Sequence, residues 1–546
     1  MAGASPATRQ LMTGSASLPV PAAPAGRARP AWILAIAGAN LTVIQFVAMR
    51  EFASLLGSNE LVTLLVTAGY FLGLSAGYLV SDRLSRRALL ALGAATLALH
   101  ASLPFSARWV VGALVEAGFG GVVPPLVFLL VFAGITPFYA VFLPRLVAEA
   151  GPPAGDSSPL VRLYAIELAG GALGLLLVVL VTPARMSWLL ALHLAGLVAL
   201  LLLFAQPRRP GAFLLCALPP AYLLVWPALD RSSLAGFYAH ALGRHSPVVL
   251  ASEFSPYQRV DLLRADTPRG PATYLYLNGN LLYGTRALHQ HNLMVSILPR
   301  LVADVGRPGV PLQTLVIAGG SLDSARHLAP LPGRVRLVEI DEAVVRLTRA
   351  LIQEPRGGFP ANWDLSIDDG KHFLGNWTGA PFDVIAVDIP VPSHVQTAML
   401  HSERFFSLAR SRLQPGGIFS ISLAGRLNTR SDGAPDASEH LAHRIAAGLL
   451  ASFRHVAVVH ADSTDFAWAS DEPLEGRIAV AQERLVDFLD REPGRRETFG
   501  VPVLQFFDDA TILRRVGAHK PIGEADLQIV LRLSLSKLRH RFYAEN

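Results

Sequence analysis

Seven long apolar segments dominate the first part of the chain. Each has close to the roughly 20 residues that a helix needs to cross a bilayer. We therefore expect a transmembrane helical domain over residues 31–230, after a disordered tail over residues 1–30 that is rich in Ala, Pro and Gly. The segments run at about 31–50, 60–81, 88–105, 122–144, 163–182, 186–205 and 212–229.

Beyond residue 247 the long apolar runs give way to short ones. Residues 248–250, 260–263 and 273–277 have the pattern of strands, and Asn278-Gly279 is a typical hairpin turn. These features predict a small β-meander within residues 247–300.

Residues 301–480 alternate apolar strands with helical stretches. Strands separated by helices imply a parallel sheet with right-handed crossovers. We expect strands at 314–318, 335–339, 364–367, 383–387 and 417–422, with helices at 321–328, 341–353, 371–376 and 400–413.

The predicted fold class is a multi-pass α-helical membrane domain followed by an α/β Rossmann-like domain of the methyltransferase type, with a small N-terminal β-meander. Residues 481–546 are expected to form a C-terminal extension. Within it, residues 527–542 have the pattern of a basic amphipathic helix that packs on the domain or on lipid.

Composition supports the division into two parts. The chain is 52% hydrophobic and 16% charged, and most of the apolar excess precedes Asp230. The net charge of +6 comes largely from Arg, without a Lys-rich stripe, which favours a lipid bilayer and excludes nucleic acid as the partner. The single cysteine, Cys216, excludes intrachain disulfides and multi-thiolate sites, and no metal is expected.

Arginine clusters follow the second and the sixth apolar segment. We expect the protein to lie in the cell inner membrane. Because these two loops are four crossings apart, both can face the cytoplasm. A seventh crossing would then place the soluble domain on the far side. The prolines of that segment leave open a re-entrant or interfacial helix instead. The arginines are Arg83, Arg86 and Arg87, then Arg208 and Arg209, and the prolines are Pro219, Pro220 and Pro227.

Small residues in the second segment predict close helix packing. Gly69, Gly73 and Gly77 recur every four residues, so they lie on one helical face.

Glu167 in the fifth segment has two interpretations. A carboxylate within a bilayer is costly, so Glu167 is either a pathway residue or an interfacial ion-pair partner of Arg162, about one turn away. His100 and His193 are expected to be ordinary polar helix positions.

The strand ends of the α/β domain carry the candidate chemistry. Ligands of open α/β sheets bind beyond the carboxyl ends of the strands. Gly319 and Gly320 leave the first strand, where bare backbone lets a nucleoside approach. Glu339 ends the second strand and can accept from both ribose hydroxyls. Asp369 follows the third strand and can accept from an adenine amino group, and Asp388 follows the fourth strand near the transferred group. The alternative is that such acids only cap helices.

At these positions residues 247–480 resemble the spermidine synthase family, the polyamine aminopropyltransferases. The apolar part also resembles the membrane segments fused to bacterial members of that family. The motifs that carry the resemblance are Ser255-Pro256-Tyr257-Gln258, Leu277-Asn278-Gly279, Ala318-Gly319-Gly320, Val338-Glu339-Ile340-Asp341, Asp369-Gly370 and Leu413-Gln414-Pro415-Gly416-Gly417.

The resemblance implies that Gln258, Glu339 and Asp369 hold decarboxylated S-adenosylmethionine through its tail, its ribose and its adenine. Gly319, Gly320 and Gly370 would complete this cofactor-binding set. Asp388 would be the catalytic base that takes the proton of a small-molecule amine. The nucleoside is implied as a co-substrate, so no tightly bound cofactor is expected.

The chain departs from the family pattern around the amine. Ser321 stands for the aspartate of the glycine loop, and Leu322 and Asp323 replace the next two glycines. Val391 replaces the second carboxylate of the D-S-x-D-P motif, and the acids of the D-E-x-x-Y-H-E motif are absent from residues 287–293. Each lost acid removes a charge-assisted contact of roughly 1.5–3 kcal/mol.

Three functions therefore remain open. The first is a membrane-bound aminopropyltransferase with an altered or less charged acceptor. The second is another S-adenosylmethionine-dependent enzyme, such as a methyltransferase, and the third is a non-catalytic nucleoside sensor or transport partner. His289 or His291 could supply a neutral base in place of the lost acids, although at i, i+2 they do not share a helical face. Assembly into a homo-oligomer also stays open.

Overall fold

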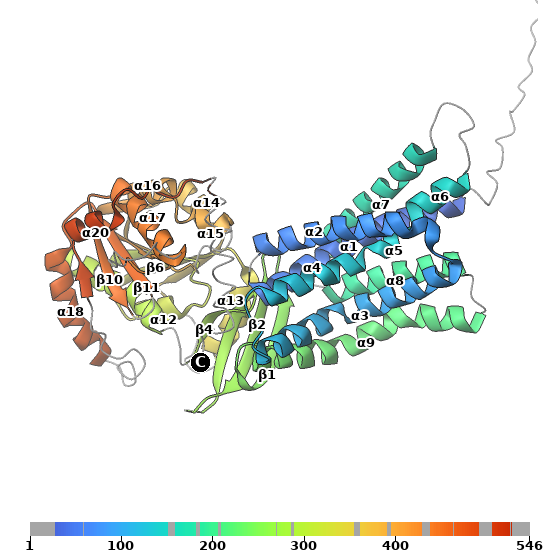
Figure 1. Cartoon of the computed structure of the whole chain (residues 1–546). Helices are drawn as coiled ribbons and strands as arrows, with labels where there is room; N and C mark the ends of the chain where they lie inside the picture. The colour runs from blue at the N-terminus through green and yellow to red at the C-terminus, as the bar shows by residue number, and fades with distance from the viewer. Residues whose placement is uncertain are drawn as a thin grey trace, which may run out of the picture.

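The protein has a bundle of long helices at one end and an α/β sheet structure at the other, with a small four-stranded sheet between them (Figure 1). The computed structural model describes residues 28–57, 59–150, 159–181, 186–205, 209–268, 270–285, 289–353, 361–389, 395–427, 437–461, 464–490, 505–524 and 526. The expected helix at 527–542 and most of the expected tail lie outside these residues. Helix α1 already begins at Ala28, within the stretch that was expected to be disordered.

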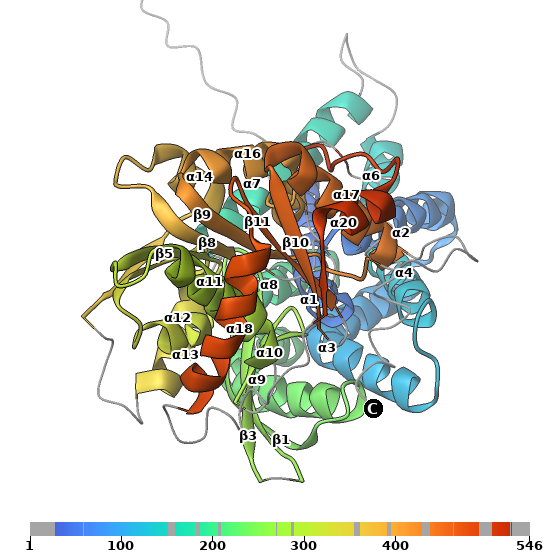
Figure 2. The ribbon, with the colours of Figure 1, turned by 90° about the vertical axis from the view of Figure 1, so that its left-hand side faces the viewer.

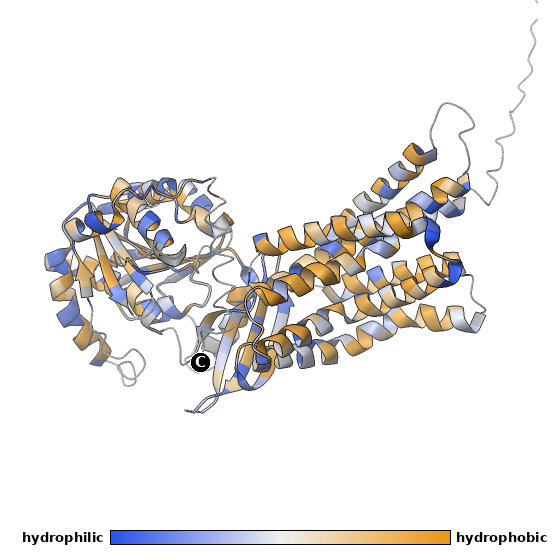
Figure 3. Ribbon diagram, in the orientation of Figure 1, coloured by the Kyte–Doolittle hydropathy of each residue, from blue (hydrophilic) through white to orange (hydrophobic). Residues whose placement is uncertain are grey.

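Seven helical stretches of the described chain are long and apolar enough to cross a membrane, as the hydropathy pattern predicts. Apolar residues prevail throughout this bundle (Figure 3). The fourth stretch, Val123–Ala150, contains three successive helices. The helices are α1 (Ala28–Leu56), α2 (Asn59–Val80), α3 (Arg86–Glu116), α4 (Val123–Ile135), α5 (Pro137–Ala140), α6 (Phe142–Ala150), α7 (Pro159–Val181), α8 (Met186–Ala205) and α9 (Arg209–His240).

Helix α9 runs without interruption through its three prolines, so the chain does not turn back within this segment. Proline in a membrane helix is tolerated where neighbouring groups satisfy the freed carbonyl oxygens. Because α9 traverses the whole bundle, the α/β part lies at the opposite end from the arginine-rich loop between α2 and α3 (Figure 1).

The glycine face of α2 packs against α4 and α5, which confirms the predicted close contact. A Cβ atom added to Gly69 would lie 3.0 Å from the Leu129 carbonyl oxygen, and one added to Gly77 would lie 2.6 Å from the Pro137 carbonyl oxygen. At Gly73 the added atom would lie only 1.8 Å from Thr136 Oγ1. The helix backbones therefore approach too closely for any side chain at these positions.

Gly73→Ala is expected to destabilise the bundle, because overpacking a closed contact costs about 1–3 kcal/mol. The matched control is Gly134→Ala on α4, where an added Cβ meets nothing within 4 Å. Thermal unfolding of the purified full-length protein checks the difference. Equal melting temperatures for the two variants would contradict the packing argument.

The four-stranded sheet is the predicted β-meander. Its strands pair antiparallel in chain order. Asn278 and Gly279, both at positive φ (47° and 67°), form the turn between the third and fourth strand. The strands are β1 (His245–Phe254), β2 (Arg259–Asp266), β3 (Ala272–Leu277) and β4 (Asn280–Gly284).

The main sheet has eight strands in the order β12-β10-β11-β9-β8-β5-β6-β7. The five strands expected from the sequence are present and parallel. The central strand β8 is buried along its whole length, as a strand covered on both faces must be. These five are β5 (Leu312–Ile317), β6 (Gly333–Glu339), β7 (Trp363–Ile367), β8 (Phe382–Val387) and β9 (Leu413–Ser422).

Three further strands, β10 (His455–Ala461), β11 (Thr464–Ser470) and β12 (Gln505–Phe507), extend the sheet antiparallel and were not predicted. Because β12 pairs with β10, the described part of residues 481–546 belongs to this domain and is not a separate extension. This is a correction of the expected boundary at 480, which also falls inside helix α18 (Glu475–Asp490).

Helices cover both faces of the main sheet (Figure 2). One apolar core joins the sheet to α16, α17 and α20, and the other joins it to α11 and α18. These helices are α11 (Leu298–Gly306), α16 (Glu403–Ser411), α17 (Ala437–Ser452) and α20 (Asp509–Val516), and the shorter ones are α10 (His289–Asn292), α12 (Asp323–Leu328), α13 (Glu342–Gln353), α14 (Gly370–Asn376) and α15 (Val395–Met399).

A buried ionic cluster fastens the helical bundle to the meander. Arg108 on α3 lies 3.0 Å from Glu51 on α1 and 2.7 Å from Asp230 on α9. Arg259 on β2 lies 3.2 Å from Glu51, 3.1 Å from Asp230 and 3.1 Å from Asp261. The side chains of Glu51 and Arg108 are 0% exposed and that of Arg259 is 2% exposed. Two guanidinium groups thus pair with three carboxylates at the end of the bundle that faces the α/β domain.

Candidate active site

The expected site residues follow adjacent strands at one edge of the sheet. Strands β8, β5, β6 and β7 are neighbours and parallel, so their carboxyl ends coincide. Backbone bonds tie the loops that leave them: the Asp388 amide donates to the Ile317 carbonyl at 2.9 Å, and the Asp368 amide donates to that of Glu339 at 3.0 Å. Asp388, Gly319, Glu339 and Asp369 therefore follow one another along this edge.

Glu339 is buried, with 7% of its surface exposed. Its Oε2 accepts from the Gly320 amide and its Oε1 from the Asp341 amide, both at 3.0 Å. A Cβ atom on Gly320 would lie 2.5 Å from Glu339 Oε2, so the loop needs a glycine there. Burial raises the pKa of Glu339 to about 7, against the lowering effect of the amide donors.

Asp341 caps helix α13, and Glu339 does not. The Asp341 Oδ1 accepts from the Ala343 amide at 3.1 Å, as an N-cap side chain does. The alternative that an acid after β6 only caps a helix therefore applies to Asp341. The Glu339 carboxylate instead binds the Gly320 amide of the glycine loop. Glu339 is the last residue of β6.

Gln258 joins the meander to the same edge. Its Nε2 donates to Asp341 Oδ2 at 3.2 Å, and the Ser255 hydroxyl donates to the same oxygen at 2.7 Å. The turn between β1 and β2 therefore lies beside the loop that carries Glu339.

Asp388 lies in a hydrogen-bonded group that the sequence did not reveal. The carboxylate is 7% exposed, His291 Nε2 lies 2.9 Å from its Oδ1, and the Ser324 hydroxyl lies 3.2 Å from its Oδ2. The His291 ring packs edge-on against Phe466, with 5.2 Å between ring centroids. In the described chain the next helix after Asp388 is α15, which begins at Val395, so Asp388 is not an N-cap.

A second buried acid extends this network. Ser324 Oγ lies 3.2 Å from Asn292 Oδ1, and Asn292 Nδ2 donates to Asp323 Oδ2. Asp323 is completely buried and forms an ion pair with Arg326 at 2.6 Å. The Asp323 carboxylate, which replaces a family glycine, is therefore neutralised by its own neighbours. It therefore does not replace the negative charge of the family aspartate in whose position Ser321 stands.

The glycine loop keeps a left-handed backbone without all of its glycines. Ala318 has φ 60° and Leu322 has φ 58°. A left-handed residue with a Cβ costs roughly 1–2 kcal/mol, so the loop stores strain where the resemblance places the nucleoside.

Asp369 lies at the expected edge, but its side chain is exposed and turned to its own helix. It accepts from the His372 amide at 2.9 Å and thus caps α14. It also borders a cavity of about 490 Å³ between α14 and α16. Gly370 is buried, and a Cβ there would lie 2.3 Å from Ile317 Cγ2, so this glycine packs directly on β5.

Polar groups of the helical bundle also differ from expectation. His100 Nδ1 and His193 Nε2 lie 2.8 Å apart, so they form a buried pair and are not separate polar positions. Glu167 is 8% exposed, and its Oε2 has no hydrogen-bond partner within the described residues. The expected ion pair with Arg162 at the membrane surface is therefore not what this carboxylate forms.

No group of three His, Cys, Asp or Glu side chains that could hold a metal ion occurs in the described parts of the chain. The His291 ring is engaged with Asp388, and the side chain of His289 lies outside the described residues. The site therefore consists of carboxylates, hydroxyls, amides and one imidazole.

Comparison with known proteins identifies this part of the chain. Residues 306–430 match the family model of the spermine/spermidine synthase domain. A polyamine aminopropyltransferase of Mycobacterium tuberculosis is 28% identical over 401 residues, which cover 69% of this chain and 73% of that protein. A polyamine aminopropyltransferase of Corynebacterium efficiens is 32% identical over 239 residues, 43% of each chain.

Among solved structures, a probable spermidine synthase from Corynebacterium glutamicum aligns with a TM-score of 0.38 at 20% identity, covering 50% of this chain and 94% of that chain. The residues after α9 make up little more than half of the sequence, so the mycobacterial match must extend into the helical part. The matched domain contains the glycine loop, Glu339, Asp369 and Asp388. Residues 306–430 therefore match the spermine/spermidine synthase domain family, and the relatives that resemble a larger part of the chain are polyamine aminopropyltransferases.

Proposed function

We propose that the chain is a membrane-bound aminopropyltransferase, which transfers an aminopropyl group from decarboxylated S-adenosylmethionine to a small amine. The observation that carries the proposal is the buried Asp388 carboxylate, which lies between His291 and Ser324 beside the glycine loop. A carboxylate in that place can receive the proton that an amine loses on reaction. The relatives named polyamine aminopropyltransferases support the same reaction class.

In this reaction a neutral amine attacks the propyl carbon next to the sulfonium. The C–N bond forms as the C–S bond breaks, the sulfur keeps the bonding electrons, and methylthioadenosine leaves. The amine proton passes to Asp388, whose carboxylate His291 and Ser324 hold in one orientation. Glu339 would accept the ribose hydroxyls and so fix the sulfonium in line with the amine.

The rest of the nucleoside would lie along the same edge. Gln258, which reaches the loop after β6 through Asp341, would contact the aminopropyl tail, and the sugar would approach the backbone at Gly319 and Gly320. Asp369 and Gly370 lie at the adenine end, and binding there requires Asp369 to accept from the amino group as well as from its own helix.

The acceptor should carry less positive charge than the usual polyamines. Ser321 and Val391 occupy family carboxylate positions, and the neighbouring Asp323 is already paired with Arg326. The imidazole of His291 and the amide of Asn292 face Asp388 and Ser324 without adding negative charge. A dication would find few partners for its second ammonium group.

The test is product formation from decarboxylated S-adenosylmethionine labelled in the propyl group, with amines of one, two and three positive charges. We expect transfer to amines of low charge and much less to putrescine. A parallel reaction with methyl-labelled S-adenosylmethionine examines methyl transfer, the second candidate. Nucleoside binding without product in either reaction would favour a non-catalytic sensor.

One observation favours that second candidate. The buried Ser321 replaces an aspartate that would repel the carboxylate of intact S-adenosylmethionine. A serine hydroxyl can donate a hydrogen bond to this carboxylate, so methyl transfer is the reaction to exclude first.

Glu339→Ala is expected to abolish measurable heat of binding of methylthioadenosine, because the ribose loses its acceptor. In the unmodified protein, affinity should rise about tenfold from pH 6 to pH 8, as a carboxyl with a pKa of about 7 passes from mostly protonated to mostly ionised. Isothermal calorimetry across this range checks both results. Affinity that falls with rising pH would contradict the assigned role of Glu339.

We also propose that the seven apolar stretches cross the cell inner membrane. Arg29, Arg86 and Arg145 lie at the end of the bundle away from the α/β domain. Positive residues concentrate at the membrane surface and in cytoplasmic loops, so the three arginines support a bundle that spans a membrane and has this end at its surface.

A further inference from the structure

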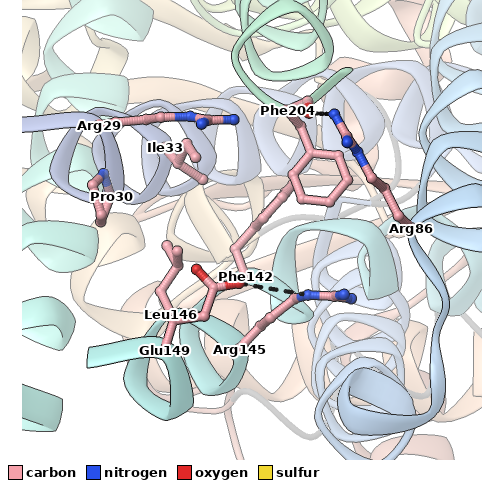
Figure 4. A pocket seen from close by; sticks show the side chains of 9 residues that line it. All are labelled: Arg29, Pro30, Ile33, Arg86, Phe142, Arg145, Leu146, Glu149 and Phe204. Carbon is pink, nitrogen blue, oxygen red and sulfur yellow. Dashed lines mark hydrogen bonds and ion pairs between the residues drawn. The ribbon is translucent and has the colours of Figure 1, made fainter. Parts of the chain in front are cut away.

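A basic cavity lies at the end of the helical bundle that is remote from the α/β domain. It has a volume of about 420 Å³ and is enclosed by α1, α3, α6 and α8. Three arginines from three different helices contribute to its lining: Arg29, Arg86 and Arg145. Figure 4 shows them grouped around the ring of Phe204.

Hydrogen bonds to backbone carbonyls, two in helix α8 and one in the loop before α3, hold the three guanidinium groups in place. Arg29 donates to the Leu203 carbonyl oxygen, and Arg86 donates to that of Phe204 at 3.1 Å. Arg145 donates to the Leu84 carbonyl oxygen at 3.0 Å. The guanidinium carbons of Arg86 and Arg145 each lie 6.0 Å from the centre of the Phe204 ring. The cationic groups are therefore positioned before any ligand arrives, which lowers the entropy cost of binding.

The charges around the cavity do not cancel. Glu149 is the one acid among its lining residues, and the Arg145 Nε lies 4.0 Å from its carboxylate. Three arginines and one glutamate leave a formal charge of +2 on the lining. Cations held this close to one another repel, and an anion with several oxygens would relieve that repulsion.

The position of the cavity indicates which kind of anion it can bind. Helices α1 and α3 begin and α8 ends at this level, which is the headgroup depth if the bundle crosses a bilayer. Ile33, Phe142 and Leu146 make the deeper lining apolar. A ligand that fits has a phosphate above and hydrocarbon below, and basic pockets between membrane helices bind such headgroups. Arginine suits phosphate because its planar fork donates two parallel hydrogen bonds.

We propose that this cavity is a binding site for a phosphate group, supplied by an anionic phospholipid of the membrane. Arg86 and Arg145 hold the phosphate oxygens together with Arg29, and the apolar lining receives the start of an acyl chain. This site is separate from the nucleoside edge and does not depend on the chemistry proposed there.

The test uses the full-length protein in detergent and native mass spectrometry with added phosphatidylglycerol or phosphatidylcholine. We expect at least about tenfold tighter retention of phosphatidylglycerol, lost in the double variant Arg86→Gln/Arg145→Gln and kept in the control Arg87→Gln, since each charged contact is worth roughly 1.5–3 kcal/mol. Arg87 is exposed at the same end of α3 but does not line the cavity. Inorganic phosphate in a third series shows whether a soluble phosphate occupies the same site.

The variant Glu149→Gln tests whether lost binding in Arg86→Gln/Arg145→Gln comes only from misfolding. Removing the acid of the lining should strengthen phosphatidylglycerol binding, a gain that a damaged protein does not produce. The proposal is overturned if the double variant retains the lipid like the unmodified protein, if Arg87→Gln loses as much, or if Glu149→Gln leaves the affinity unchanged.

Discussion

Asp388→Asn is expected to lower turnover by about 10²–10⁴-fold while leaving nucleoside affinity nearly unchanged, because a positioned general base contributes that much to rate. The amide has the shape of the carboxylate but cannot take a proton from the amine. Its backbone bond to Ile317 remains, and its side-chain oxygen can still accept from Ser324. Transfer of the labelled propyl group to the amine measures turnover, and calorimetry measures nucleoside binding.

The matched control is Asp364→Asn on β7. That carboxylate also binds two groups, Arg334 at 2.6 Å and Arg336 at 2.9 Å, but it lies away from the loops that carry the site. We expect Asp364→Asn to keep full turnover. If Asp388→Asn keeps it as well, Asp388 is a structural acid that orders His291 and Ser324, and the proton acceptor must be another group.

The five parallel strands and the seven apolar stretches could be predicted because each has a local period. Most of strand β8 is an apolar run, from residue 384 to residue 387, and Asn278-Gly279 is a residue pair that favours the positive φ angles of a hairpin turn. The antiparallel strands β10 and β11 required knowing that the chain folds back onto β9, which is a non-local pairing. The three-residue strand β12 is too short to show any period.

The candidate site divides in the same way. Glu339 and Asp388 could be predicted because they directly follow strands whose ends must coincide. His291 was only one of two histidines with an open role, since its contact to Asp388 spans 97 residues of sequence. Asn292 and Ser324 carried no signal, because such residues are common in helices and loops. Their role arises where α10 and α12 meet the end of β8.

The ionic cluster at the junction was equally hidden, although its members stand at informative places. Glu51 and Asp230 directly follow predicted apolar segments, and Arg108 lies three residues beyond another. Hydropathy assigns such residues to the membrane surface, where charges are usually hydrated. The packing of β2 against the ends of these helices removes that water and leaves Arg259 to pair with the acids.

Arg259→Met is expected to lower the free energy of unfolding by about 3–5 kcal/mol, because removing one partner of a buried ionic group leaves the others uncompensated. Glu51 and Asp230 would then keep Arg108 as their guanidinium partner in this cluster, and Asp261 would lose its ion pair with Arg259. Chemical denaturation of the full-length protein in detergent measures the loss. Arg334→Met serves as the control, since its ion pair with Asp364 has a 53% exposed arginine and is worth about 0–1 kcal/mol.

A second variant shows how much of the stability loss in Arg259→Met comes from unpaired carboxylates and how much from lost packing. Arg259→Met/Asp261→Asn removes one of the unpaired carboxylates, so it should recover part of the stability. Equal stability of Arg259→Met and Arg334→Met would contradict the account. Because β2 begins at Arg259, next to Gln258, loosening this junction should also weaken methylthioadenosine binding through the Gln258 contact to Asp341. The helical bundle would thereby influence the proposed nucleoside site through one buried arginine.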